Sequence, residues 1–187
     1  AATSLFDGDA NTTDVLGGPD RWDGRFESPA GQPDWHGWTH RDLTAPDGNH
    51  WQVSTYFADN LNGHGPGNHA MWCGEDLPSC GPDDPEGGYG DRYLDALVWR
   101  RAVADPAQPV EVALSAWLNT DLVDAGWDFL YYEVWTADGW ERIETWTGTY
   151  DNVHFEHVLT LQPGDYAGEN DDEVRLRWLV QTDWGWS

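Results

Sequence analysis

Lysine is missing from this chain, and cations of any kind are scarce. The 187 residues include 9 Lys plus Arg and 34 Asp plus Glu, for a formal net charge of −25, and every basic residue is Arg. Nucleic acids and anionic membranes bind basic surfaces, which release counterions or meet lipid headgroups. The composition therefore argues against both partners and favours divalent cations.

Long apolar runs and common catalytic signatures are also absent from the sequence. No stretch approaches the roughly twenty apolar residues that a membrane-spanning helix needs. Neither HExxH nor GxSxG occurs, so the motifs of zinc peptidases and α/β-hydrolases are missing. The glutamates Glu133, Glu141 and Glu144 lack the tight spacing of a glycosidase carboxylate pair, and we expect them to face outward. We expect no enzyme and no membrane span.

Only two cysteines occur, Cys73 and Cys80, within the run CGEDLPSC. The short polar loop between them contains a proline and suits a small disulfide. We expect this disulfide and, with it, an extracellular protein that is secreted or surface-attached. The pair lies in residues 59–91, a segment dense in Gly, Pro, Asn and Asp, which we interpret as a long loop that is either functional or simply stapled.

Aromatic and β-branched residues, by contrast, are abundant, and the chain has 14 Trp. They occur in strand-length runs separated by turn-forming residues. In the run 173–182, Val174 and Leu176 fall on one face while Arg175 and Arg177 fall on the other. The sequence Ala-Asp-Gly at 137–139 predicts a hairpin. The expected strands lie within 36–44, 50–58, 92–101, 109–118, 128–136, 140–147, 152–161 and 173–182.

We divide the chain into a loop-rich segment, residues 1–25, and a β-sandwich domain, residues 26–187. The motifs of the second part follow a recognisable order: FES (26–28), WHGWTHRDLT (35–44), HWQVST (50–55), WDFLYYEVWTADGWERI (127–143) and EVRLRWLVQTDWGWS (173–187). This order resembles the jelly-roll modules attached to immune inhibitor A-type secreted metallopeptidases. Those modules are similar in turn to MAM-like domains of cell-surface proteins.

The resemblance implies an all-β jelly-roll sandwich of concanavalin/MAM-like type that acts as a non-catalytic accessory module. It also implies a structural Ca²⁺ near the sandwich edge, held by Glu27, Asp42, Asp128 and Asp183. Oxygen ligands of this kind suit calcium. In the alternative interpretation, Asp128 and Asp183 only cap turns through their side chains.

Tryptophan supplies a second functional alternative, a carbohydrate-binding module. Flat indole faces stack on sugar rings while polar neighbours take the hydroxyl groups, and Trp140, Trp184 and Trp186 are the candidates. We expect Trp135 and Trp178 to fill the core instead. The partner is thus a glycan or a protein at the cell surface.

The resembling modules continue past the equivalent of residues 181–187 with one more strand, which closes the sheet. We therefore expect an unpaired edge beside residues 173–182. Such an edge accepts a strand from another chain, so self-association through a neighbour's strand is a third alternative.

Overall fold

The computed structural model describes residues 35, 37–43, 51–55, 69–74, 94–122 and 125–183. Within these ranges the chain forms strands and turns, with no helix and hence none that is long and apolar enough to cross a membrane. The strands are β1 (Trp38–Asp42), β2 (Trp51–Ser54), β3 (Ala70–Cys73), β4 (Leu94–Ala102), β5 (Val110–Leu122), β6 (Phe129–Thr136), β7 (Gly139–Trp146), β8 (Gly148–Leu161) and β9 (Glu173–Gln181).

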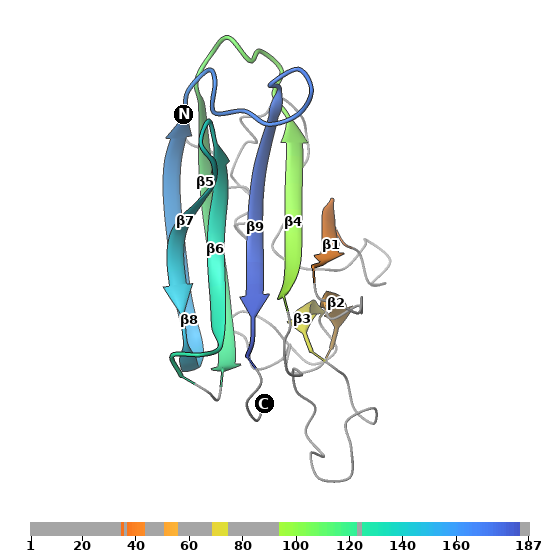
Figure 1. The fold of residues 1–187 in the computed structure, drawn as a ribbon, viewed down its shortest axis with the longest axis vertical. Coiled ribbons are helices and arrows are strands. Elements are labelled where there is room, and N and C mark those ends of the chain that lie inside the picture. Colours follow the sequence, from red (N-terminus) through yellow and green to blue (C-terminus); the bar gives the residue numbers. More distant parts are fainter. Residues whose placement is uncertain are drawn as a thin grey trace.

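A five-stranded antiparallel sheet in the order β1-β4-β9-β6-β7 forms one layer (Figure 1). Strand β9 lies inside this sheet, because Trp178 is paired with Leu97 of β4 on one side and with Tyr132 of β6 on the other. The expectation of an unpaired edge beside residues 173–182 is therefore wrong. The chain's own strands pair with both sides of β9 from Leu176 to Gln181, so no neighbour's strand is needed there.

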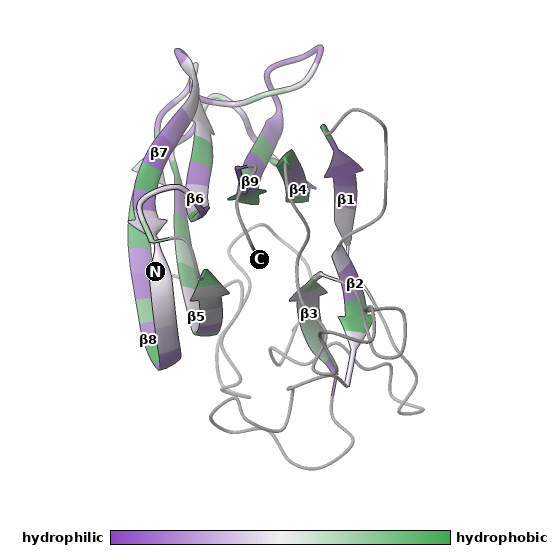
Figure 2. Ribbon diagram, turned by 60° about the horizontal axis from the view of Figure 1, so that its bottom comes forward, coloured by the Kyte–Doolittle hydropathy of each residue, from purple (hydrophilic) through white to green (hydrophobic). Residues whose placement is uncertain are grey.

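Two further antiparallel pairs, β5–β8 and β2–β3, lie on the same side of the five-stranded sheet (Figure 2). Figure 2 also shows purple and green bands alternating along β8, as expected for a strand with one apolar and one polar face. Inward side chains of β5 and β8, such as Val112, Leu114 and Leu161, contribute to a common core with the larger sheet. The fold is all-β and sandwich-like, as the sequence predicts at this level.

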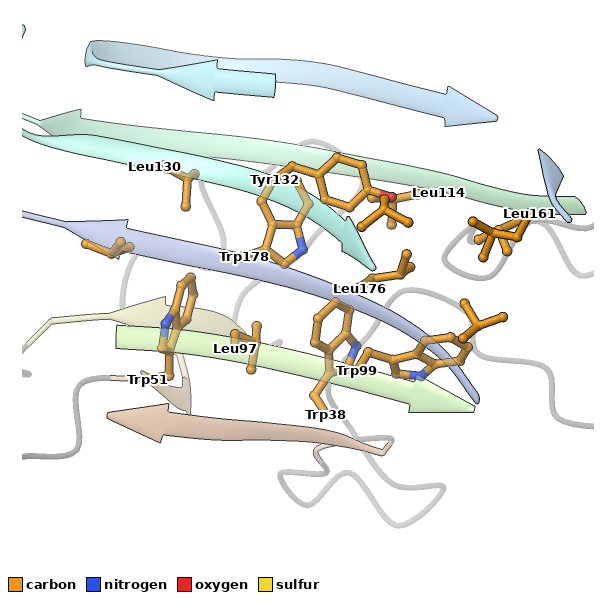
Figure 3. Close-up of a cluster of buried hydrophobic side chains, with 14 of the residues drawn as sticks. Trp38, Trp51, Leu97, Trp99, Leu114, Leu130, Tyr132, Leu161, Leu176 and Trp178 are labelled. Atoms are coloured by element: carbon orange, nitrogen blue, oxygen red, sulfur yellow. The ribbon is translucent and has the colours of Figure 1, made fainter. Parts of the chain in front are cut away.

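The core is built from the inward side chains of both layers (Figure 3). Val174, Leu176 and Trp178 alternate inward along β9, and Val112 and Leu114 do so along β5. Because strand side chains alternate between faces, each strand gives the core every second residue. The alternation read from the sequence for residues 173–182 is confirmed, and β5 follows the same rule.

The predicted hairpin at 137–139 joins β6 to β7, with Gly139 at a φ of 101° that favours glycine. Strand β3 was not predicted, since residues 59–91 read as loop throughout. Its four residues pair with β2 and place Met71 and Cys73 against the core. A run this short, among Gly and Asn, carries almost no strand periodicity of its own.

Candidate functional site

Four residues form an exposed patch on the outer side of the β5–β8 pair, which we call the Trp117 face. Ser115 and Trp117 of β5 lie opposite Glu156 and His154 of β8 in the strand register. The Trp117 and His154 rings stack with centroids 4.5 Å apart and planes 22° apart. Trp117 is 38% exposed, so an oriented aromatic surface faces solvent.

Polar atoms fix the histidine of this face. Ser115 Oγ lies 2.9 Å from His154 Nε2, and Glu156 Oε1 lies 3.7 Å from the same nitrogen. A serine hydrolase instead needs its carboxylate at Nδ1, where it orients the ring for proton transfer. Because both contacts use Nε2, the arrangement holds the ring as a support for Trp117, which suits binding better than nucleophilic catalysis.

The sequence analysis did not select Trp117 or His154. The sequence did contain a signal for the orientation of Trp117, because Val110, Val112 and Leu114 show which positions of β5 point into the core. Trp117 has the opposite parity, which places a large indole on the outer side. An outward indole places a large, flat apolar surface with a polar N–H at the solvent boundary.

A buried carboxylate organises the outer side of the five-stranded sheet. Glu133 accepts hydrogen bonds from Arg142 Nε at 3.0 Å and Arg142 Nη2 at 2.9 Å, and from Arg177 Nε at 2.6 Å. The Arg142 guanidinium lies 3.3 Å from the Tyr131 ring centroid, and that of Arg177 lies 4.3 Å from the Trp140 centroid. Cation–π contacts and charge-assisted hydrogen bonds thus form one network.

This network corrects two expectations from the sequence. Glu133 is only 3% exposed, whereas Glu141 and Glu144 are exposed as expected. Trp178 fills the core as expected, but Trp135 does not. Both Glu133 and Trp135 occupy outward positions of β6, where neighbouring side chains bury or half-bury them, an outcome that alternation alone does not reveal.

Trp140, one of the candidate sugar-binding residues, lies on this outer side. Its ring is half-buried and meets Trp135 edge to face, with centroids 5.4 Å apart and planes 89° apart. Arg177 occupies part of its surface, so Trp140 is a less open platform than Trp117. Trp184 and Trp186 lie outside the described residues.

The predicted calcium ligands that the structure describes lie at one end of the five-stranded sheet. Asp128 is 2% exposed, and its Oδ1 accepts a hydrogen bond of 3.0 Å from the backbone N–H of Asp183. Its carboxylate therefore ties the segment after β9 to the start of β6. Because this hydrogen bond joins residues 55 positions apart, it is a long-range tie and differs from the local turn caps of the alternative interpretation, which stay a prediction.

Asp42 does not join that pair. It ends β1, while Asp128 precedes β6, and strands β4 and β9 lie between. Three strand spacings correspond to about 14 Å, whereas oxygen ligands of one calcium ion lie about 5 Å apart or less. Within the described ranges, no three His, Cys, Asp or Glu form a group that could hold a metal.

The described residues therefore do not fit a single calcium shell built from the predicted set. Glu27, the remaining predicted ligand, lies outside the described residues. A calcium site that includes Asp128 or Asp42 would have to draw its other ligands from outside those ranges. The ion stays a prediction.

Cys73 carries a free thiol in the structure, so the expected Cys73–Cys80 disulfide is not seen. The side chain packs against the core from β3, and Cys80 lies outside the described residues. Burial, followed by the negative charges of Asp95 and Asp42, raises the pKa of the Cys73 thiol. A thiol in this environment is mostly protonated and reacts slowly.

A groove of about 360 Å³ opens between the β6–β7 turn and the end of β8. Its walls include Asp138, Glu141, Asp165 and His157. Asp165 Oδ2 accepts a hydrogen bond of 2.8 Å from the Gln162 N–H, which fixes that carboxylate to its own loop. Burial lowers the pKa of His157, so the groove contains a neutral imidazole beside acidic groups.

Comparisons with protein-family models and with curated proteins find no match to this sequence. The resemblance to accessory modules of secreted metallopeptidases therefore stays a prediction. The function is therefore inferred from the geometry and side-chain chemistry of the Trp117 face and of the outer side of the five-stranded sheet.

Proposed function

We propose that this chain is a non-catalytic accessory module that binds glycans, as part of a secreted or surface-attached protein. The observation that carries the proposal is the oriented, solvent-facing indole of Trp117, stacked on His154. A pyranose offers an apolar C–H surface for such a ring and hydroxyl groups for hydrogen bonds. The Ser115 hydroxyl and the Glu156 carboxylate lie beside the ring and supply both donor and acceptor atoms.

The proposal includes a jelly-roll connectivity for the sandwich. Four of the five connections from β4 to β9 pass between the five-stranded sheet and the β5–β8 pair: β4 to β5, β5 to β6, β7 to β8 and β8 to β9. Such repeated crossing is typical of double-sheet Greek-key folds and is absent from simple meanders. It supports the jelly roll without identifying a family, since one fold serves many functions.

The decisive experiment compares Trp117→Ala with the parent on a glycan array, followed by affinity electrophoresis in gels that contain the best soluble polysaccharide. Aromatic side chains at a binding surface commonly carry about 1.4 kcal/mol or more, so retention should weaken at least tenfold. Trp127→Ala is the matched control, because Trp127 is 66% exposed but lies in the β5–β6 turn, outside the Trp117 face.

The control variant should bind as the parent does. Equal binding by Trp117→Ala and the parent would contradict the assignment of the site. A parent protein that binds no glycan on the array would contradict the function as a whole.

A further inference from the structure

Arginine gathers on the outer side of the five-stranded sheet, which faces away from β5–β8. Side chains alternate along a strand, and Trp38, Leu97 and Leu176 belong to the core on the inner side. Residues of opposite parity on the same strands therefore point outward. The charged residues at these outward positions are Arg41, Arg100, Arg142, Arg175, Arg177, Glu133 and Glu173.

We call these positions the arginine face. Five arginines stand there against two glutamates, although the whole chain has only 9 basic residues and 34 acidic ones. An unselective distribution of charge would leave any face of this protein strongly negative. Among the described strand positions the arginine face instead carries a positive excess, which attracts anionic groups over distances up to about one Debye length, roughly 8 Å at physiological salt.

Three of the arginines have carboxylate partners on the face itself. Arg142 and Arg177 share Glu133, as described above. Arg175 donates to Glu173, with Nη2 2.7 Å and Nε 2.8 Å from Oε2. These pairs explain why three guanidinium groups can lie close together on one sheet.

Arg100 has no such explanation. It is exposed and lies directly opposite Arg175 in the β4–β9 register. It forms no hydrogen bond or ion pair with any residue in the described ranges. Like charges directly opposite each other destabilise a sheet, and a chain this rich in carboxylates had many alternatives. Departures of this kind from local rules are concentrated at functional sites.

Two indoles continue the same row across the sheet. Arg100, Arg175, Trp135 and Trp140 occupy four adjacent strands, β4, β9, β6 and β7, so the row is about 14 Å long. The Arg175 guanidinium lies 5.9 Å from the Trp135 ring centroid, and Trp135 meets Trp140 edge to face. One end of the row is cationic, with a guanidinium that has no partner among the described residues, and the other end is aromatic and half-buried.

We propose that this row binds a carboxylate-bearing oligosaccharide, a glycan that contains uronic acid residues. The carboxylate binds the Arg100 guanidinium in the planar, bidentate geometry that arginine favours, beside Arg175, whose Nε and Nη2 already bind Glu173. The following sugar rings lie along Trp135 and Trp140. Glu173 already supplies a counter-charge to Arg175, so the ligand carboxylate supplies the one that Arg100 lacks among the described residues.

This site goes beyond the proposed function, since it lies on the other layer of the sandwich from the Trp117 face and selects a charged ligand. The test uses isothermal titration calorimetry at low salt with tetramers of galacturonate, mannuronate and glucuronate. The methyl ester of the galacturonate tetramer is the neutral counterpart. The parent should bind at least one acidic tetramer, bind the ester at least tenfold more weakly, and lose affinity as salt is raised.

The key variant is Arg100→Gln, with Arg101→Gln as its matched control. The two residues are neighbours on β4, so each change removes one positive charge at nearly the same place. Arg101 has the inward parity of its strand and Arg100 the outward one. Arg100→Gln should weaken binding at least tenfold, whereas Arg101→Gln should change it less than twofold.

Folding of both variants is checked by their thermal midpoints. The midpoint of Arg100→Gln should stay close to that of the parent, because losing a repulsive neighbour of Arg175 and losing a cation from a protein of charge −25 have opposite effects. Three results would overturn the proposal: equal binding by the two variants, equal binding of acid and ester, or no binding of any acidic tetramer. A tetraglutamate peptide that binds as tightly as the best glycan would overturn it too. Trp117→Ala should leave this binding unchanged, so failure here and failure of the Trp117 face are distinguishable.

Discussion

Replacing Glu133 with glutamine tests whether the outer network holds the five-stranded sheet together. The side chain of Glu133 is 4% exposed, and those of its partners Arg177 and Arg142 are 17% and 46% exposed. Removing one partner of a fully buried ion pair costs about 3–5 kcal/mol. Because water screens the half-exposed Arg142, we expect a smaller loss of about 2–3 kcal/mol for Glu133→Gln.

The free energy of unfolding is measured by urea titration, with thermal midpoints as a second readout. A domain of this size loses about 2–4 °C per kcal/mol, so the midpoint should fall by about 4–12 °C. The control is Glu141→Gln, which removes the same charge from an exposed position on β7. In so acidic a protein, that change should be neutral or slightly stabilising, because it relieves self-repulsion.

The two variants are easily distinguished, because Glu133→Gln should lower the free energy of unfolding, whereas Glu141→Gln should leave it unchanged or raise it slightly. If Glu133→Gln unfolds within about 0.5 kcal/mol of Glu141→Gln, the change is no larger than that of an ordinary surface substitution. The network would then contribute nothing to stability, and the reasoning from its burial would be refuted.

Four further predictions concern single groups or one ion. Tyr132 Oη is buried without a hydrogen-bond partner in the described part of the chain, so Tyr132→Phe should raise the free energy of unfolding by about 1 kcal/mol; a loss of stability would contradict this. Burial lowers the pKa of His157 below its usual 6.5, so the unfolded chain binds a proton at this histidine more readily than the folded chain does. The contribution of neutral His157 to the free energy of unfolding is therefore complete above about pH 6.5 and is lost as the pH falls through the folded-state pKa. The urea midpoint of His157→Gln should therefore fall less between about pH 7 and pH 5 than that of the parent, and equal slopes would sink the idea. Iodoacetamide should label Cys73 in urea but not in the folded protein, whereas protection in urea that ends only on adding a reductant would reveal the Cys73–Cys80 disulfide. If the predicted calcium ion binds, EDTA lowers the thermal midpoint and added Ca²⁺ restores it; an unchanged midpoint would remove the ion from the account.

Strand positions from residue 92 onward were predictable because the side chains there repeat with a period of two over long runs. Val174 and Leu176 turn inward and Arg175 outward, as the alternation requires. The hairpin at 137–139 was predictable for a local reason too, since Gly139 adopts a positive φ. Local rules of this kind need no knowledge of the partner strand.

The order of strands in the sheet was not predictable in the same way. Alternation shows which face a residue occupies but not which strand lies beside it. The last strand was therefore placed at an edge, while β9 pairs with both β4 and β6. The burial of Glu133 could not be predicted for the same reason, because it depends on Arg142 and Arg177, which come from two other strands.

The candidate site was only partly within reach of the sequence. Trp140 was selected and lies on an outer face, but its surroundings depend on Arg177, a residue far away in the chain. The low content of basic residues suggested that no positive surface exists. Composition averages over the whole surface, so it cannot show that alternate positions on adjacent strands bring Arg100, Arg175 and Arg177 together.

The central position of β9 also constrains how the protein is made. Strands β4 and β6 emerge from the ribosome before β9, yet within the five-stranded sheet they are joined only through β9. Until residues 173–181 are synthesised, both strands have an open hydrogen-bonding edge facing the same gap. We expect the nascent chain to remain unable to complete this layer until β9 has emerged, and to fold slowly once β9 inserts, because its contacts are so distant in sequence.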